Sequence, residues 1–130
     1  MITLTLTDTI VPKARPRGTP TGRHYLPDNY RQWKDNAIWE LKQQHHGSPI
    51  AVPVQIEILL IGKHSRRGDA DNIAGAILDA MVQAGILKDD NLTRIPSLSL
   101  KLFHNPDDPV AHIRIEEYKP QFPEWIYRAI

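Results

Sequence analysis

The sequence predicts a mixed α+β protein in which a mixed sheet of about four strands packs against two main helices. Some segments alternate apolar with polar residues, as half-buried strands do, and two others repeat apolar residues every three or four positions, as amphipathic helices do. The predicted order is strand, helix, strand, helix, strand, strand, followed by a C-terminal tail. Because the chain has 130 residues, 41% of them hydrophobic, we expect a single domain over residues 1–130.

The first half of the chain predicts two strands and one helix. Residues 2–6 alternate isoleucine and leucine with threonine and predict a strand, whereas residues 18–27 have the composition of a turn-rich connection. Asp28 is expected to cap a helix with a buried stripe of Tyr30, Trp33, Ala37 and Leu41. Residues 52–60 predict a second strand, and the additional apolar residues Leu59 and Ile61 predict cover on both sheet faces.

The second half predicts one helix and two strands. The helix is expected to begin near Asp71 and to end at Gly85 in a left-handed conformation. Its buried face would consist of Ile73, Ala76, Ile77, Ala80, Met81 and Ala84. Residues 98–102 and 111–115 alternate again, and the turn-forming residues 105–109 predict a hairpin between them. The tail, residues 120–130, would pack on the core or on a partner.

Charge and cysteine content limit the possible functions. The net charge is only +1, but basic residues are concentrated between positions 11 and 46 and again just before an acidic motif, so one face could attract phosphate. The absence of cysteine excludes disulfides, zinc-thiolate sites and a thiol nucleophile. The alternating N-terminus does not resemble a signal peptide and no apolar run is long enough to span a membrane, so a cytoplasmic protein is the default expectation.

Three aspartates that bracket the second helix are candidate ligands for a Mg²⁺-type ion, because hard cations prefer oxygen ligands. Asp69 and Asp71 would point to the same side of an extended segment, with α-carbons roughly 6.6 Å apart. Asp90 follows a helix that carries the chain roughly 20 Å away. It can join the pair only if the chain doubles back along the helix or if a second subunit supplies it. We expect the first, through a strand that starts within residues 87–92.

These carboxylates also have interpretations without a metal. Asp71 and Asn72 are common at helix starts, where free amides and the helix dipole stabilise an aspartate, and Asp89-Asp90 alone would be a solvated turn. A helix-loop-helix calcium site is excluded, since its terminal glutamate would fall on Ala80.

Two neighbouring residues have less direct roles. Asp79 is about 12 Å beyond Asp71 along the helix, so a structural hydrogen bond or ion pair is expected for it. His64 could act as a base, although a histidine in a basic loop is more often a phosphate contact or a bystander.

The same residues resemble those of the RusA-type Holliday junction resolvases, or crossover junction endodeoxyribonucleases. The resemblance rests on three motifs, Arg66-Arg67-Gly68-Asp69-Ala70-Asp71-Asn72, Leu78-Asp79-Ala80 and Asp89-Asp90, supported by residues 11–17 and 25–34, and it covers most of the chain to about Ile115. It implies a dimeric mixed α/β nuclease, dependent on Mg²⁺ or Mn²⁺, that resolves four-way DNA junctions. It also implies that Asp69, Asp71 and Asp90 are the essential carboxylates, both metal ligands and catalytic residues.

One position departs from the family pattern. The family has a functionally important lysine in the first turn of the helix, and Gly75 occupies that position here. A cation from a different direction would have to replace it, for which the candidates are Lys63, Arg66, Arg67 and Lys88.

The DNA-binding surface is expected to consist of basic residues that contact backbone phosphates. The candidates are Lys13, Arg15, Arg17, Arg23, Lys63, Arg66, Arg67 and Lys88. An ordinary solvated loop is the alternative interpretation for the first four. Because a four-way junction has near twofold symmetry, paired cuts call for a homodimer, with Trp39, Phe122 and Trp125 as dimer contacts or core residues.

Two other functions remain open from the sequence. The chain could be a catalytically silent protein that binds branched DNA, because of Gly75, or it could be a general nuclease for flaps and branched DNA.

Overall fold

The computed structural model describes residues 1–13, 17–18, 24–25, 27–64 and 68–129. In chain order its elements are β1 (Ile2–Thr7), β2 (Arg17–Gly18), β3 (His24–Tyr25), α1 (Asp28–Gln44), β4 (Val54–Ile61), α2 (Ala70–Gln83), β5 (Ser97–Phe103), β6 (Val110–Glu117) and α3 (Ile126–Ala129). The mixed α+β order predicted from the sequence is confirmed. The structure adds the short β2–β3 pair in the basic loop and the single turn α3 in the tail.

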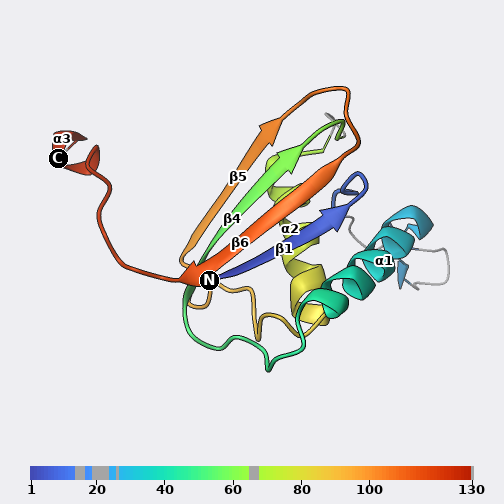
Figure 1. Ribbon diagram of the computed structural model, residues 1–130, viewed down its shortest axis with the longest axis horizontal. Helices are drawn as coiled ribbons and strands as arrows, with labels where there is room; N and C mark the ends of the chain where they lie inside the picture. The colour runs from blue at the N-terminus through green and yellow to red at the C-terminus, as the bar shows by residue number, and fades with distance from the viewer. Residues whose placement is uncertain (14–16, 19–23, 26, 65–67, 130) are drawn as a thin grey trace.

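The four longer strands form one mixed sheet in the order β1-β6-β4-β5 (Figure 1). β6 is antiparallel to both β1 and β4, whereas β5 is parallel to β4. The predicted hairpin between residues 98–102 and 111–115 is therefore wrong, because β4 separates these strands. α2 returns the chain to the start of β4, so the next strand pairs with β4 in parallel, as a helical crossover requires.

Both main helices cover the same face of this sheet (Figure 1). Along β4 the residues Val54, Ile56, Ile58 and Leu60 are buried and alternate with partly exposed residues. Leu59 and Ile61 belong to the second set, so the expected cover on both faces is wrong. The sheet and the helices therefore make two layers with the apolar core between them.

The two helices bury the stripes that their periodicity predicted. α1 buries Tyr30, Trp33, Ala37 and Leu41 against the sheet and α2, as expected. Its N-cap, however, is Pro27, and Asp28 lies in the first turn, where it forms a 2.9 Å ion pair with Arg31. α2 ends as predicted, because Gly85 follows the helix with a φ of +78°.

The tail leaves the sheet after β6 and extends away from the two layers (Figure 1). Phe122 and Trp125 are 71% and 61% exposed, so they do not belong to the core, and Trp39 on α1 is also exposed. Within the described ranges, the helices are too short or too polar to cross a lipid bilayer.

Candidate active site

Asp69 and Asp71 stand at the beginning of α2, just beyond the end of β4. Asp69 is the N-cap residue, with an extended backbone (φ −68°, ψ 144°), and Asp71 lies in the first turn. Both side chains are exposed, and the described residues show no side-chain hydrogen bond that caps this helix. Asp71 thus occupies the helix-start position that the non-metal interpretation gave it, where the helix dipole favours a negative charge, but no hydrogen bond to the free amides of the first turn is found among the described residues. Both remain available as oxygen ligands.

The turn that carries the pair is fixed by close backbone packing. A Cβ atom on Gly68 would lie 2.5 Å from Cγ of Pro12, so Pro12 packs directly on the start of the motif. The next residue, Lys13, donates its amide hydrogen to the carbonyl oxygen of Asn72 at 2.8 Å. The segment after β1 is therefore attached to the first turn of α2.

Asp90 lies toward the other end of α2. After the helix, Leu87 forms an isolated parallel bridge with Ile50, and the amide of Lys88 donates to the carbonyl oxygen of Ile50 at 3.1 Å. The amide of Val54, the first residue of β4, donates to the carbonyl oxygen of Arg94 at 2.9 Å. The connection that contains Asp90 thus crosses the sheet at the start of β4 (Figure 1), whereas Asp69 follows the end of β4.

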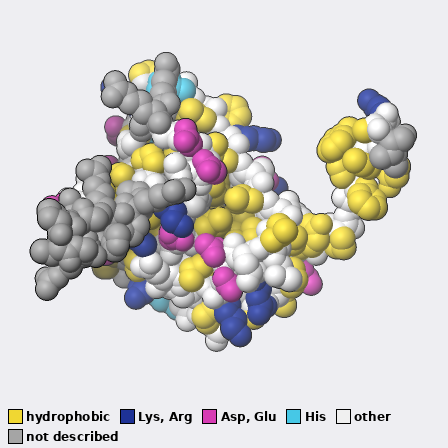
Figure 2. All heavy atoms as spheres, turned by 180° about the vertical axis from the view of Figure 1, so that it is seen from behind, with side chains coloured by type: hydrophobic (Ala, Val, Ile, Leu, Met, Phe, Trp, Pro, Cys, Tyr) yellow, Lys and Arg dark blue, Asp and Glu magenta, His cyan; other side chains and the backbone are white. Residues whose placement is uncertain are grey.

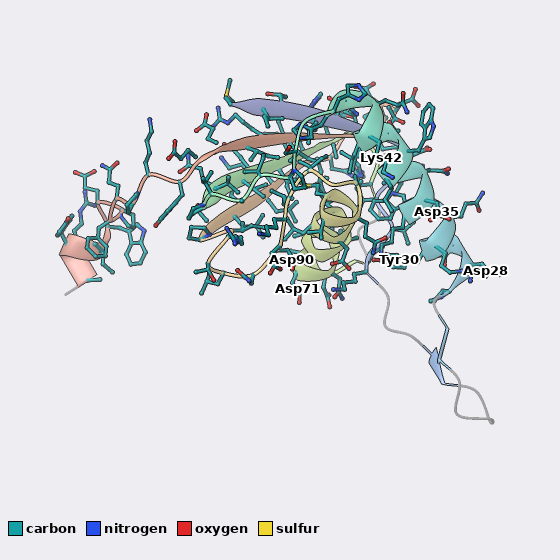
Figure 3. The ribbon with its side chains drawn as sticks, turned by 90° about the horizontal axis from the view of Figure 1, so that it is seen from below. Asp28, Tyr30, Asp35, Lys42, Asp71 and Asp90 are labelled. Atoms are coloured by element: carbon teal, nitrogen blue, oxygen red, sulfur yellow. The ribbon has the colours of Figure 1, made fainter. Side chains whose placement is uncertain are left out.

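The three aspartates do not meet within one chain. From Asp71 to the end of α2 the axis advances roughly 18 Å, and Asp90 lies beyond that end. Across the described ranges, no three His, Asp or Glu side chains are close enough together to hold a metal ion. Figure 3 views the molecule from below, so Asp71 and Asp90 project near each other although α2 separates them in depth. The strand expected within residues 87–92 is absent apart from the bridge at Leu87.

The turn around Asp90 has a defined shape because Asp89 organises it. Asp89 Oδ1 accepts the amide hydrogen of Asp90 at 2.8 Å, and its Oδ2 accepts from Nδ2 of Asn91 at 2.9 Å. Both oxygens of Asp89 are therefore used inside the turn, whereas the Asp90 side chain is exposed. The structure thus separates the roles of two adjacent aspartates that the sequence alone could not distinguish.

The predicted basic residues divide into two groups. Lys13, Lys63 and Lys88 have exposed side chains, and Lys88 lies near Asp90. Arg15, Arg23, Arg66 and Arg67 lie outside the described residues, and Arg17 is described only as part of β2.

Lys13 makes a contact with α2 that the sequence did not suggest. Its Nζ lies 3.2 Å from Oδ2 of Asp79, which confirms the ion pair expected for Asp79. A Cβ atom on Gly75 would lie 3.3 Å from Cδ of Lys13, so the lysine stem crosses the helix at the glycine. Lys13 was not among the four cations that the sequence suggested as replacements for the missing lysine at Gly75.

His64 has a structural role. It is 4% exposed, and its Nε2 lies 3.1 Å from the carbonyl oxygens of both Ile61 and Val110. Nε2 therefore carries the hydrogen and holds two strand ends together. The remaining ring nitrogen, Nδ1, is buried and makes no hydrogen bond with the described residues, so the structure gives no support for His64 as a base that reaches a water near Asp69.

Tyr30 on α1 adds a buried phenol near Asp79 on α2. Burial raises the pKa of Tyr30 to about 12, and the negative charge of Asp79 adds to this effect. Figure 3 shows Tyr30 between the two helices.

An uncovered apolar row on β5 is a feature that the sequence reasoning missed. Leu98 and Leu102 are 43% and 46% exposed although they pair with the buried Ile56 and Leu60 of β4 and so face the helix side of the sheet. Figure 2 shows hydrophobic side chains gathered in the middle of that face, with acidic side chains above and below them. Three leucines alternate along β5, so the sequence did indicate an apolar face on this strand. The hairpin prediction, however, paired β5 with β6, so the exposure of that face was not foreseen.

Comparison with known proteins shows the family to which this chain belongs. Residues 9–116 match the family described as Endodeoxyribonuclease RusA, a class of enzymes that hydrolyse phosphodiester bonds in DNA. The chain is also 37% identical over 95 residues, 70% of this chain and 73% of the relative, to the protein named Crossover junction endodeoxyribonuclease RusA from Aquifex aeolicus (strain VF5). The chain therefore belongs to the RusA family of endodeoxyribonucleases.

Proposed function

We propose that this protein is a Mg²⁺- or Mn²⁺-dependent endonuclease that resolves four-way DNA junctions by paired phosphodiester hydrolysis. It works as a homodimer in which each active site combines Asp69 and Asp71 of one subunit with Asp90 of the partner subunit. The observation that carries the proposal is the position of exposed aspartates at opposite ends of α2. The family membership and the name of the Aquifex relative support the reaction and the substrate.

A twofold axis perpendicular to α2, near the middle of the helix, would bring the separated aspartates of two copies together. Such an axis exchanges the two ends of the helix, so it brings the Asp90 end of one copy to the Asp69 end of the other. The same operation makes two equivalent sites, one at each end. Two equivalent sites are what symmetric cuts in a nearly twofold-symmetric junction require.

The uncovered apolar row on β5 supports this arrangement. Leu98 and Leu102 lie on the helix side of the sheet, which a second copy related by that axis would cover. An isologous interface pairs such a row with itself in the opposite direction. Removing these side chains from water favours the dimer by roughly 25 cal/mol for each Å² of apolar surface buried.

The donor atoms fit a hard divalent cation. Asp69 and Asp71 offer carboxylate oxygens that no helix cap uses, and Asp89 holds the turn that presents Asp90. A bound Mg²⁺ lowers the pKa of a water ligand and offsets the charge that develops on the phosphate oxygens. The chain itself contributes the positions of these carboxylates at helix and turn backbones, together with cations such as Lys13, Lys63 and Lys88 that attract the phosphate backbone.

Mixed dimers test the proposal directly. Asp71→Asn and Asp90→Asn are each expected to abolish cleavage of a synthetic four-way junction in Mg²⁺. If the sites are shared, a heterodimer of the two variants has one site that lacks both residues and one intact site. Random mixing then restores about a quarter of the wild-type sites, and the products are single nicks rather than paired cuts. If each chain builds its own site, both sites of every heterodimer are damaged and the mixture stays inactive.

Comparing junction, flap and duplex DNA as substrates distinguishes a junction resolvase from a silent DNA-binding protein and from a general nuclease for branched DNA. Wild-type protein is expected to cut the junction in preference to flap and linear duplex DNA at one salt concentration, because electrostatic affinity changes steeply with salt. Tight junction binding without nicks would instead indicate a silent binding protein. Equal cleavage of flaps and junctions would indicate a general nuclease for branched DNA.

A further inference from the structure

Lys13 crosses the surface of α2 and touches it at three places. Its amide donates to the carbonyl oxygen of Asn72 at 2.8 Å, its stem passes over Gly75, and its Nζ lies 3.2 Å from Oδ2 of Asp79. These contacts extend over about two turns of the helix. Lys13 is therefore held along α2 and is not a freely moving loop cation.

The crossing brings the Lys13 stem close to the glycine in the middle of the helix. Glycine lowers helix stability relative to alanine, so an interior glycine calls for a packing reason. A Cβ atom at position 75 would lie 3.3 Å from Cδ of Lys13, closer than ordinary van der Waals contact. Gly75 thus gives the lysine stem room to lie against the backbone.

The crossing also places the positive charge of Lys13 on the side of α2 that carries the candidate metal ligand Asp71. Asp71, Gly75 and Asp79 are spaced four residues apart, so they follow one another along one side of α2. The stem of Lys13 lies at the middle position, between the two aspartates. Its side chain is 48% exposed, whereas that of Asp79 is 21% exposed, so a phosphate from solvent can reach the ammonium group.

We propose that Lys13 binds a backbone phosphate of the DNA strand that is cut, further along α2 from the phosphate at Asp69 and Asp71, and that Asp79 holds its ammonium group while DNA is absent. A strand whose scissile phosphate lies at the start of α2 would then continue along this side of α2, where Lys13 exchanges Asp79 for a phosphate. A lysine does this readily, since it is a point charge on a flexible stem. The proposal rests on the proposed nuclease function and adds a specific substrate contact to it.

Two variants separate a phosphate contact from a purely structural tether. Lys13→Met keeps an apolar stem over Gly75 but removes the charge, and Asp79→Asn removes the other partner of the same ion pair. A structural tether predicts that both variants change stability and junction affinity in the same direction. A phosphate contact predicts opposite effects on affinity, because Asp79→Asn frees the lysine and removes a negative charge from the DNA-binding face.

The measurement is binding of a labelled four-way junction without divalent metal, so that no cleavage occurs, over a series of salt concentrations. We expect Lys13→Met to weaken binding about tenfold and to reduce the salt slope by about one. Asp79→Asn is expected to bind at least as tightly as wild type. Lys42→Met, which removes an exposed lysine in the last turn of α1, is the matched control and should bind like wild type.

A relocated lysine provides a positive test. In the double variant Lys13→Ala/Gly75→Lys the ammonium group extends from the helix at the place where the Lys13 stem lay, and binding should return to within about threefold of wild type. Lys13→Met with wild-type affinity and salt slope, or Asp79→Asn weakened as much as Lys13→Met, would overturn the proposal. If wild type itself fails to bind the junction, the proposed function fails instead.

Discussion

Gly62 and Asp108 meet backbone to backbone at the end of β4, where a Cβ atom on Gly62 would lie 2.5 Å from the carbonyl oxygen of Asp108. Gly62 also has a φ of +96°, in the region that favours glycine. We therefore predict that Gly62→Ala lowers the free energy of unfolding by at least about 2 kcal/mol, because the variant combines backbone strain with a clash. Urea denaturation followed by circular dichroism measures the change.

Gly85→Ala is the matched control for this prediction. Gly85 has a similar φ of +78°, but a Cβ atom there would have no neighbour within 4 Å among the described residues. This variant should lose only about 1 kcal/mol, the cost of the left-handed conformation alone. Equal losses at both positions would show that the contact with Asp108 is not close.

The buried phenol of Tyr30 predicts a loss of stability at alkaline pH. Burial, followed by the charge of Asp79, raises the pKa of Tyr30 to about 12 from its ordinary value of 10.0. Because the pKa is higher in the folded state, the contribution of the neutral phenol is fully present below pH 10 and is lost as the pH rises from 10 to about 12. Tyr30→Phe removes the titrating group, so its free energy of unfolding should fall less over this interval than that of wild type.

The same variant has an expected effect at neutral pH. The hydroxyl of Tyr30 is buried without a hydrogen-bond partner among the described residues. Removing it should leave the stability unchanged or raise it by about 1 kcal/mol, because no hydrogen bond is lost. Tyr127→Phe, at an exposed phenol in the tail, is the control and should leave the neutral stability unchanged. A clear loss of stability in Tyr30→Phe at pH 7 would show that the hydroxyl has a partner.

Local pattern was sufficient to predict the two main helices and the four longer strands, but not the short β2, β3 and α3. The apolar spacing of Tyr30, Trp33, Ala37 and Leu41 predicted the buried face of α1, and Gly85 predicted the end of α2. These predictions succeed because helix periodicity and glycine conformation depend on neighbouring residues only.

The pairing of the strands could not be obtained in the same way. The alternation of Leu98, Leu100 and Leu102 predicts a strand with one apolar face, but it does not say which strand lies beside it. The turn residues between β5 and β6 favoured a hairpin, whereas the crossover through α2 places β5 on the free edge of β4. Which strand pairs with β5 depends on packing between segments that are distant in the sequence, and a short turn motif carries no information about that packing.

The sequence also predicted only part of the candidate site. Asp69 and Asp71 are neighbours in sequence, and the structure keeps them together at the start of α2. The position of Asp90 depends on the direction of the connection after α2, which bonds to Ile50 rather than returning along the helix. The role of Lys13 was also out of reach, because its contact with Asp79 joins residues that are 66 positions apart in the sequence.

Asp89 provides a test of how the Asp90 turn is held. Its two carboxylate oxygens accept from the amide of Asp90 and from Nδ2 of Asn91. Asp89→Ala removes both hydrogen bonds, so Asp90 should be held less firmly and junction cleavage should fall about 10–100-fold, the usual cost of losing a group that orients a metal ligand. Because the turn is exposed, the melting temperature should change little.

A Mg²⁺ titration distinguishes a positioning role of Asp89 from a role as a metal ligand. If Asp89 only positions Asp90, raising the Mg²⁺ concentration should recover part of the activity of Asp89→Ala, whereas Asp90→Asn stays inactive at every concentration. Complete and unrecoverable inactivity of Asp89→Ala would instead make Asp89 a ligand itself.

The uncovered leucines on β5 predict where the dimer can be broken. Leu98→Glu/Leu102→Glu places two charges on the face that we propose the second copy covers, and burying an unpaired charge is strongly unfavourable. Sedimentation velocity should show a monomer at concentrations where wild type is a dimer, and paired cutting of the junction should be lost. Phe103→Glu is the matched control, because Phe103 is 58% exposed on the same strand but on the opposite face of the sheet. If the leucine variant remains a dimer while Phe103→Glu becomes a monomer, the subunits meet through the open face of the sheet, and the sharing of Asp90 across α2 loses its geometric basis.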